Sequence, residues 1–231
     1  MEQLDQIAAI LALTMGAAWA SGINLYAAIF MLGFMGMSGN IDLPPGLEVL
    51  ENPIVLLAAG AMYVVEFFAD KIPGVDSGWD SIHTFIRIPA GAMLAAGAVG
   101  EVDPAVAVAA GILGGGLTAV THATKAGTRV LVNTSPEPFS NWAVSITEDV
   151  AVIGGLWTAL NHPILFLVGL VVFILLLIWF LPKVWRGIKG LFRRIGRLFE
   201  RDAGKTTAEE LLPESPPAVA EPPKKPESPP N

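Results

Sequence analysis

Six apolar stretches divide the chain, and each reaches or approaches the length of about 20 residues that a helix needs to cross a lipid bilayer. They run from Ile7 to Met37, Pro53 to Ile72, Trp79 to Gly100, Pro104 to Val132, Phe139 to Leu160 and Pro163 to Leu181. Only the last is an uninterrupted run without charge. The others are rich in Gly and Ala and carry polar or ionisable residues, which is typical of helices that pack against other helices through small residues. The pattern predicts an all-α, polytopic membrane bundle of about six spans over residues 1–182.

The first stretch is longer than one crossing, at about 31 residues with a rise of about 1.5 Å each. Its middle holds the polar, flexible string Ser21-Gly22-Ile23-Asn24, which indicates a broken helix. This string, with Gly33, aligns weakly with Gly115 to Thr118 followed by Gly127. Two inverted three-helix repeats, a plan found in secondary transporters, would explain the match. Chance or generic small-residue packing explains it equally well.

A different pattern follows the last span. From Val184 to Phe199 apolar residues recur at helical spacing with Lys and Arg between them, which predicts a basic amphipathic helix over 183–201 on the membrane surface. Residues 202–231 are rich in Pro, Glu, Lys and Ser and are expected to form a disordered tail.

Charge is distributed unevenly along the chain. Hydrophobic residues make up 53% and charged residues 15%, whereas a soluble domain carries about 25% charged residues. The net charge is −7, yet ten of the fourteen Lys and Arg follow residue 182. There is no basic patch in the bundle that would bind nucleic acid, and no cysteine for disulfides or thiolate metal sites.

The positions of Lys and Arg also predict topology. The connections from Ser38 to Asn52, Glu101 to Asp103 and Asn161 to His162 contain neither residue. The basic segment after Leu181 is therefore expected in the cytoplasm, and six spans place both termini there. Its basic residues are expected to contact anionic lipid headgroups: Lys183, Arg186, Lys189, Arg193, Arg194 and Arg197.

Charged residues inside the second and third stretches face one another. Glu66 and Asp70 share one helix face, and Asp80, His83 and Arg87 share a face of the next helix. Counted from the short turn between them, Glu66 lies about 9 Å deep and Arg87 about 12 Å deep. We therefore expect these two to form an ion pair.

The fourth and fifth stretches repeat this arrangement with the signs exchanged. One polar stripe is formed by Thr118, Thr121, His122, Lys125 and Arg129, and the other by Asn141, Ser145, Glu148 and Asp149. The expected partners across the turn are Lys125 with Glu148, and His122 with Asp149.

So many charges in a membrane interior need a reason, because each costs about 2.5 to 3.5 kcal/mol at the bilayer centre. They either hold helices in register as ion pairs or line a hydrated cavity open to the cytoplasmic half, and the whole set favours the cavity. The candidate residues for binding or translocating a solute or ion are Ser21, Asn24, Glu66, Asp70, Asp80, His83, Arg87, His122, Lys125, Arg129, Glu148 and Asp149.

Other chemistry finds less support. His83 alone is better explained as a satisfied, neutral core histidine. No His-Glu-x-x-His zinc motif, phosphate-binding loop or serine elbow is present. Glu66, Asp70, Asp76 and Asp80 offer oxygen ligands for a divalent cation, but Lys71 and Arg87 beside them argue against it. We expect no cofactor, assign no catalytic residue and leave a metal open.

Three strings resemble a known family: Ser21 to Tyr26, Val65 to Pro73 and Trp79 to Gly91. They are similar to a bacterial membrane family known only as a domain of unknown function, series four-one-two-six. The resemblance extends from about Leu4 to Leu181. It implies an architecture and a bacterial inner membrane, and it carries no catalytic residues.

The leading hypothesis is a small transporter or channel-like protein that binds an ion or small polar solute in a charged intramembrane cavity. One alternative is an integral-membrane enzyme acting on a lipid or polyprenyl phosphate, with Glu66 or Asp70 as general base and Lys125 or Arg129 holding the phosphate. Another is a membrane scaffold that uses the basic helix and Pro-rich tail. The expected partners are the bilayer, its anionic headgroups and an unidentified solute or ion; a homo-oligomer is left open.

Overall fold

The structure, a computed structural model, describes residues 2–72, 74–133 and 138–210. In these ranges the chain forms six α-helices and one short 3-10 helix, η1, and no β-strand. They are α1 (Glu2–Met37), η1 (Glu48–Glu51), α2 (Pro53–Ala69), α3 (Val75–Ala98), α4 (Pro104–Val132), α5 (Pro138–Asn161) and α6 (Pro163–Glu210). The expected all-α class is confirmed.

Among the described residues, four helices are long and apolar enough to cross a membrane, namely α1, α4, α5 from Phe139 and α6 as far as Gly190, and α2 is a shorter apolar helix. α3 is outside this set because Asp76, Asp80 and Arg87 lower its hydropathy, although all three side chains are buried. The chain is therefore a membrane helical bundle.

Proline and a capping side chain fix where several helices begin. The Asn52 side chain accepts a hydrogen bond from the Ile54 amide at 2.9 Å, and Pro53 is the first residue of α2. Asp103 accepts from the Ala105 amide at 2.8 Å, and Pro104 opens α4. Proline is favoured at this position because its missing N–H has no partner there in any case. These starts coincide with those expected from the sequence.

α1 is broken at Asn24, whose backbone is extended with φ −144° and ψ 98°. The predicted break is thereby confirmed, and it divides α1 into a first arm before Asn24 and a second arm after it. The Asn24 side chain accepts a hydrogen bond from the Ala27 amide at 2.9 Å, so Asn24 is the N-cap of the second arm.

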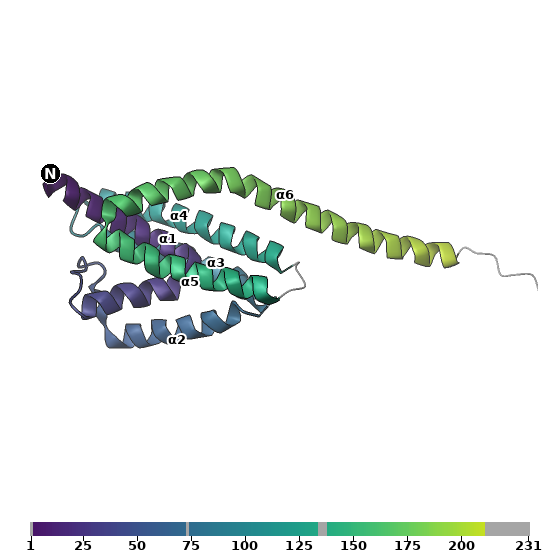
Figure 1. Cartoon of the computed structure of the whole chain (residues 1–231), viewed down its shortest axis with the longest axis horizontal. Coiled ribbons are helices and arrows are strands. Elements are labelled where there is room, and N and C mark those ends of the chain that lie inside the picture. Colours follow the sequence, from purple (N-terminus) through teal and green to yellow (C-terminus); the bar gives the residue numbers. More distant parts are fainter. Residues whose placement is uncertain (1, 73, 134–137, 211–231) are drawn as a thin grey trace, which may run out of the picture. The chain divides into compact units, whose positions relative to one another are not determined.

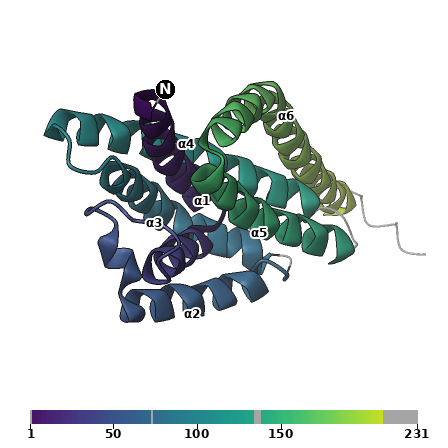
Figure 2. The same cartoon turned by 60° about the vertical axis from the view of Figure 1, so that its left-hand side comes forward.

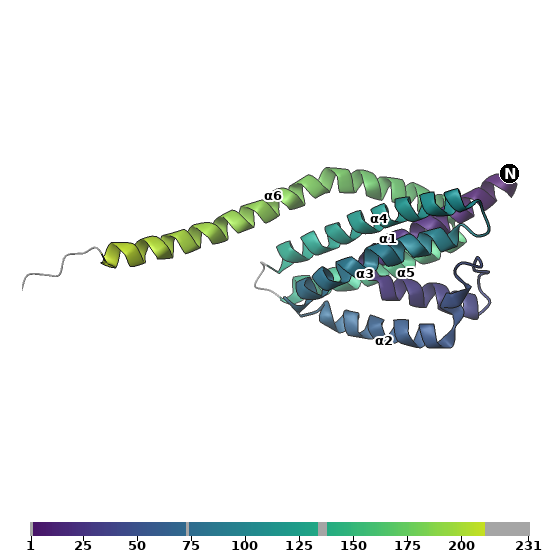
Figure 3. The same ribbon diagram turned by 180° about the vertical axis from the view of Figure 1, so that it is seen from behind.

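The two arms of α1 lie at the same end of the bundle. Gly16 of the first arm approaches Ala159 and Phe166, where α5 ends and α6 begins. Gly33 of the second arm packs on the backbone of Leu50, just before α2 begins. Figures 1 and 3 show α1 entering and returning toward the end of the bundle that carries the N-terminus. α1 therefore re-enters, and its apex points into the bundle.

Small residues let the helices approach closely around this apex. α3 packs most extensively against α4, and α1 contacts α2, α3, α4 and α5 (Figure 2). A Cβ added to Gly22 would meet the Thr118 carbonyl oxygen at 2.7 Å, and one added to Gly91 would collide with the Thr118 side chain. The two aligned strings of the proposed repeat thus touch each other, but α4 runs as a single helix where α1 is broken.

The chain divides into two compact units, Met1–Lys189, which contains the bundle, and Gly190–Asn231. α6 continues from the first unit to Glu210, so the boundaries expected at 183 and 202 fall inside one helix. Pro182 lies inside this helix, and the next proline is Pro213. Residues 202–210 belong to α6, and the remainder of the expected tail, 211–231, lies outside the described residues.

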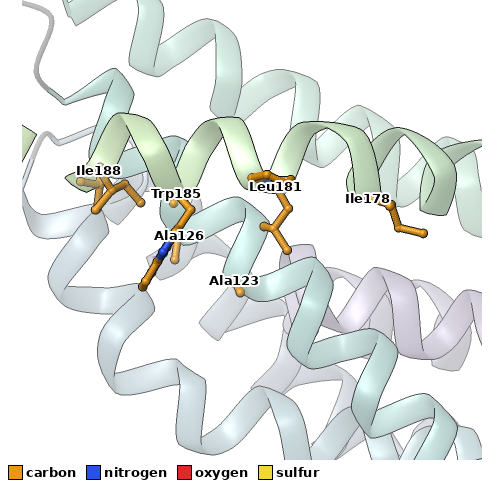
Figure 4. A pocket seen from close by; sticks show the side chains of 9 residues that line it. Ala123, Ala126, Ile178, Leu181, Trp185 and Ile188 are labelled. Carbon is orange, nitrogen blue, oxygen red and sulfur yellow. The ribbon is translucent and has the colours of Figure 1, made fainter. Parts of the chain in front are cut away.

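An apolar groove of about 740 Å³ separates α4 from α6. Figure 4 shows Ala123 and Ala126 of α4 opposite Ile178, Leu181 and Trp185 of α6. α4 thus has two different faces, because its charged residues lie among the other helices whereas its alanines face this groove. The groove is suited to hydrocarbon and is separate from the charged site.

Candidate functional site

Nine ionisable side chains from α2, α3, α4, α5 and the α2–α3 turn gather beside the apex of α1. We call them the ion cluster: Glu66, Asp70, Asp76, Asp80, Arg87, Lys125, Arg129, Glu148 and Asp149. Eight of them are buried, with Asp149 the most exposed of the eight at 8%. The Glu148 side chain is 16% exposed and is the most accessible carboxylate of the set.

Arg87 confirms the ion pair expected between the second and third stretches. Its Nη2 donates to Glu66 Oε1 at 2.5 Å, and its Nη1 lies 3.3 Å from Asp80 Oδ1. Nη1 also donates to the Ile23 carbonyl at 3.1 Å. One guanidinium therefore joins α1, α2 and α3.

Lys125 lies among four carboxylates. Its Nζ is 2.9 Å from Asp70 and 3.3 Å from Glu66. Asp80 and Glu148 follow at 3.8 Å and 3.7 Å. The expected pair with Glu148 is confirmed, but it is one of the longer contacts.

Arg129 lies on the other side of the ion cluster. Its guanidinium donates to Glu148 at 2.5 Å and to Asp70 Oδ2 at 3.2 Å. It also donates to Asn141 at 2.7 Å and to the Asp70 carbonyl at 2.8 Å. Asp76 lies 4.0 Å away. Charged hydrogen bonds in several directions hold this side chain rigidly.

The sequence placed Asp76 in the short turn and among possible oxygen ligands for a cation, but not among the charged pairs, and its side chain is completely buried. Asp76 accepts hydrogen bonds from the Gly74 amide at 2.9 Å and from the Ser77 amide at 2.5 Å. Both of its oxygens also accept from the Asn133 amide group, at 2.8 and 2.9 Å. Asp76 thus ties the α2–α3 turn to the end of α4.

The break in α1 supplies a backbone acceptor that the sequence did not predict. In an unbroken helix the Ile23 carbonyl would accept from the Ala27 amide. The Asn24 side chain takes that amide instead, so the Ile23 carbonyl is free to accept from Lys125 at 3.0 Å as well as from Arg87. Asn24 also donates to Asp149 at 3.1 Å.

Ser21 of α1 and His83 of α3, which were also predicted site residues, lie beside the ion cluster and form no ion pair with it. Ser21 is buried and donates to the Ala17 carbonyl of its own helix at 2.6 Å. His83 pairs with the Trp79 carbonyl at 2.9 Å through Nδ1 and with the Tyr26 hydroxyl at 3.0 Å through Nε2. These two bonds satisfy a neutral imidazole.

The expected pair of His122 with Asp149 is wrong. His122 Nδ1 lies 3.2 Å from Arg87 Nη1, which can only donate, so the histidine nitrogen accepts. Its Nε2 then carries the hydrogen and faces Thr84 at 2.7 Å and the Asp80 carbonyl at 3.1 Å. His122 therefore faces α3 rather than α5.

The ion cluster contains more acid than base. Six carboxylates surround three cations, which leaves a formal excess of three negative charges, or two if Lys71 at its edge is added. Several buried carboxylate oxygens accept no hydrogen bond within the described chain: Glu66 Oε2, Asp70 Oδ1, both oxygens of Asp80 and Asp149 Oδ2. Because an uncompensated charge in a low-dielectric interior is costly, the arrangement is suited to taking up positive charge.

A cavity of about 270 Å³ leads to the ion cluster between α4 and α5. Its lining includes Lys125 and Glu148 from the cluster and four threonines, Thr121, Thr124, Thr128 and Thr147. Among the described residues, no group of three or more His, Asp or Glu side chains is arranged to hold a metal ion.

The predicted headgroup residues lie on α6. Lys183 Nζ is 2.7 Å from the centre of the Trp179 ring, and Lys189 is 5.3 Å from that of Trp185. Arg186 donates to the Pro182 carbonyl at 3.2 Å, and Arg193 is exposed. The side chains of Arg194 and Arg197 lie outside the described residues.

A family model described as "Domain of unknown function (DUF4126)" matches residues 11–183. The match covers all the residues of the ion cluster and the apex of α1, and it ends near the limit of the resemblance noted in the sequence. No curated protein and no solved structure matches the chain.

Proposed function

Because the chain belongs to the DUF4126 family, whose description names no activity, we propose a function from the ion cluster itself. The protein is a small transporter or channel-like protein that binds a cation in a charged intramembrane cavity. Following the family resemblance, we place it in the inner membrane of a bacterium.

The observation that carries this proposal is the excess of buried carboxylates. Six carboxylates meet three cations, and five carboxylate oxygens accept no hydrogen bond from the described chain. Ion pairs that served only to hold helices together would balance in charge and satisfy their oxygens. Protons or other monovalent cations restore the balance, and Glu148, whose side chain is 16% exposed, is the most accessible carboxylate for them.

The lipid-phosphate enzyme receives less support from the same geometry. A phosphate needs free guanidinium or ammonium groups, but Arg129 is held by Glu148 at 2.5 Å and Lys125 by Asp70 at 2.9 Å. An anion would have to displace these carboxylates in a site that is already negative. The scaffold hypothesis depends on the tail, most of which lies outside the described residues.

The re-entrant α1 changes the expected orientation of the N-terminal end. Counting six crossings placed both termini in the cytoplasm, but α1 begins and ends beside the starts of α2 and α6. With the basic part of α6 in the cytoplasm, we place the start of α1 on the outer side. The apex at Asn24 then reaches the ion cluster from outside, and the cluster itself lies in the cytoplasmic half.

Single cysteines test this orientation, and the chain contains no native cysteine to interfere. In intact spheroplasts, Gln3→Cys and Glu48→Cys are expected to react with an impermeant maleimide, whereas Arg186→Cys reacts only after permeabilisation. Glu48 lies in η1, at the same end of the bundle as the α1 termini, and serves as the matched outer control. Protection of Gln3→Cys alongside labelling of Glu48→Cys would contradict a re-entrant α1.

Flux through purified protein in liposomes tests the function. Wild-type protein is expected to move protons or another monovalent cation, and Glu66→Gln should reduce that flux by about tenfold or more. Tenfold corresponds to about 1.4 kcal/mol, within reach of the roughly 1.5 to 3 kcal/mol of one charged hydrogen bond.

Glu48→Gln makes the same chemical change at an exposed position in η1 and should leave the flux unchanged. Absence of flux for protons and for every monovalent cation tested would refute the proposal.

A further inference from the structure

The ammonium group of Lys125 is surrounded by oxygen atoms from several parts of the fold. Asp70 and the Ile23 carbonyl lie at 2.9 and 3.0 Å from Nζ. Glu66, Glu148 and Asp80 lie at 3.3, 3.7 and 3.8 Å. We call these five oxygens the oxygen cage. Anionic oxygens and an unwound-helix carbonyl around one positive charge form the kind of shell that coordinates a cation inside a membrane protein.

We propose that the oxygen cage is a binding site for a small monovalent cation of the ammonium type, which Lys125 occupies as a tethered counter-ion. The transported cation binds by displacing the Lys125 ammonium group and taking over its oxygen ligands. This inference rests on the proposed function, since it assigns the place and the chemical class of the cation.

Lys125 is the one cation of the ion cluster whose chemistry suits displacement. A lysine ammonium is a compact charge on a flexible four-carbon chain, whereas an arginine is planar and fixed by several bonds. Arg129 is held by Asn141 and by the Asp70 carbonyl in addition to its carboxylates. The Lys125 side chain, in contrast, also lines the cavity between α4 and α5, which gives its ammonium group a place to move.

The cavity beside Lys125 also contains threonine side chains. The hydroxyls of Thr121, Thr124 and Thr147 donate to backbone carbonyls of their own helices at 2.8, 2.8 and 2.7 Å. The hydroxyls are thereby engaged with their own helices, and the surface that the cavity presents is almost entirely apolar. Glu148, with 16% of its side chain exposed, is the cluster carboxylate that lines this cavity.

Chemical rescue of a lysine deletion tests the oxygen cage directly. Lys125→Ala, purified in detergent, is expected to have a lower Tm than wild type because it leaves the carboxylates without their shared cation. Methylammonium chloride should raise its Tm by about 2 to 4 °C at a few times its dissociation constant, with no comparable rise for wild type. Tetramethylammonium chloride, which has no N–H donor and is larger, should have no such effect.

Arg87→Ala is the matched control, since it removes a neighbouring cation but leaves Lys125 in the oxygen cage; methylammonium should not stabilise it. Equal stabilisation by both salts, or none by methylammonium, would overturn the inference. If Lys125→Ala does not fold without added salt, the fallback is to purify Lys125→Ala and Lys125→Gln with methylammonium present throughout. Recovery of folded protein only with methylammonium supports the site, and failure of both variants under that condition overturns it.

The outcome is separable from that of the flux experiment. Rescue of Lys125→Ala by methylammonium without any wild-type flux would support the cation site and refute the transporter function. Wild-type flux that depends on Glu66, without rescue of Lys125→Ala, would support the transporter function but place the cation outside the oxygen cage.

Discussion

Replacement of Arg129 by Met is expected to lower the free energy of unfolding by about 3 to 5 kcal/mol, the usual cost of removing one partner from a buried ion pair. Arg129 donates to Glu148 at 2.5 Å and to Asp70 at 3.2 Å, and its side chain is completely buried. Met fills similar space but leaves both carboxylates facing an already negative site. Reversible unfolding in mixed micelles of a mild detergent and dodecyl sulfate measures the change.

Two further variants identify the cause of that loss. Arg186→Met is the matched control, because Arg186 is exposed on α6, and it should change stability by less than about 0.5 kcal/mol. Adding Glu148→Gln to Arg129→Met removes one uncompensated charge and should recover about 1 kcal/mol or more. A double variant no more stable than Arg129→Met alone would show that excess negative charge is not the reason for the loss.

Local sequence signals were sufficient for the helix starts and for the first ion pair. Asn52 before Pro53 and Asp103 before Pro104 combine a capping side chain with a proline, and both effects act within a few residues. The Glu66–Arg87 pair also follows from local geometry, since a short turn places residues at equal distances from it opposite each other.

The course of α1 could be predicted only in part. The string from Ser21 to Asn24 indicated a break, because polar and glycine residues weaken a helix there. The direction of the second arm depends on contacts with distant residues, such as Gly33 with Leu50 and Gly22 with Thr118. No local pattern distinguishes a kinked crossing from a re-entrant one. The side of the membrane expected for the N-terminal end depends on that difference.

Asp76 and His122 show the same limit within the ion cluster. The periodicity of a helix tells which residues share a face but not which neighbouring helix that face meets. His122 shares a face with Lys125 yet meets α3 through Thr84 instead of α5. The sequence placed Asp76 in the connecting turn, where aspartate is ordinary. In the structure it lies in the first turn of α3 and becomes a buried part of the site because Asn133 of the distant α4 end binds it.

Replacement of Asn24 by Ala is expected to be the second most damaging change, with a loss of about 2.5 to 4 kcal/mol. Loss of an N-cap costs about 1 kcal/mol, and loss of a donor to a buried carboxylate costs about 1.5 to 3 kcal/mol. Both apply here, since Asn24 accepts from the Ala27 amide and donates to Asp149. Asn40→Ala, the same change at an exposed turn residue, should cost less than about 0.5 kcal/mol.

The effect on flux should exceed what this stability loss explains. Without the Asn24 side chain, the Ala27 amide is free to bond with the Ile23 carbonyl, as in a continuous helix, and that carbonyl is withdrawn from Lys125 and Arg87. Folded Asn24→Ala protein should therefore lose cation flux in liposomes, whereas Asn24→Ser, which keeps an acceptor for the Ala27 amide, should retain part of it. If folded Asn24→Ala conducts as well as wild type, the Ile23 carbonyl is not a ligand of the cation, and the break in α1 serves packing alone.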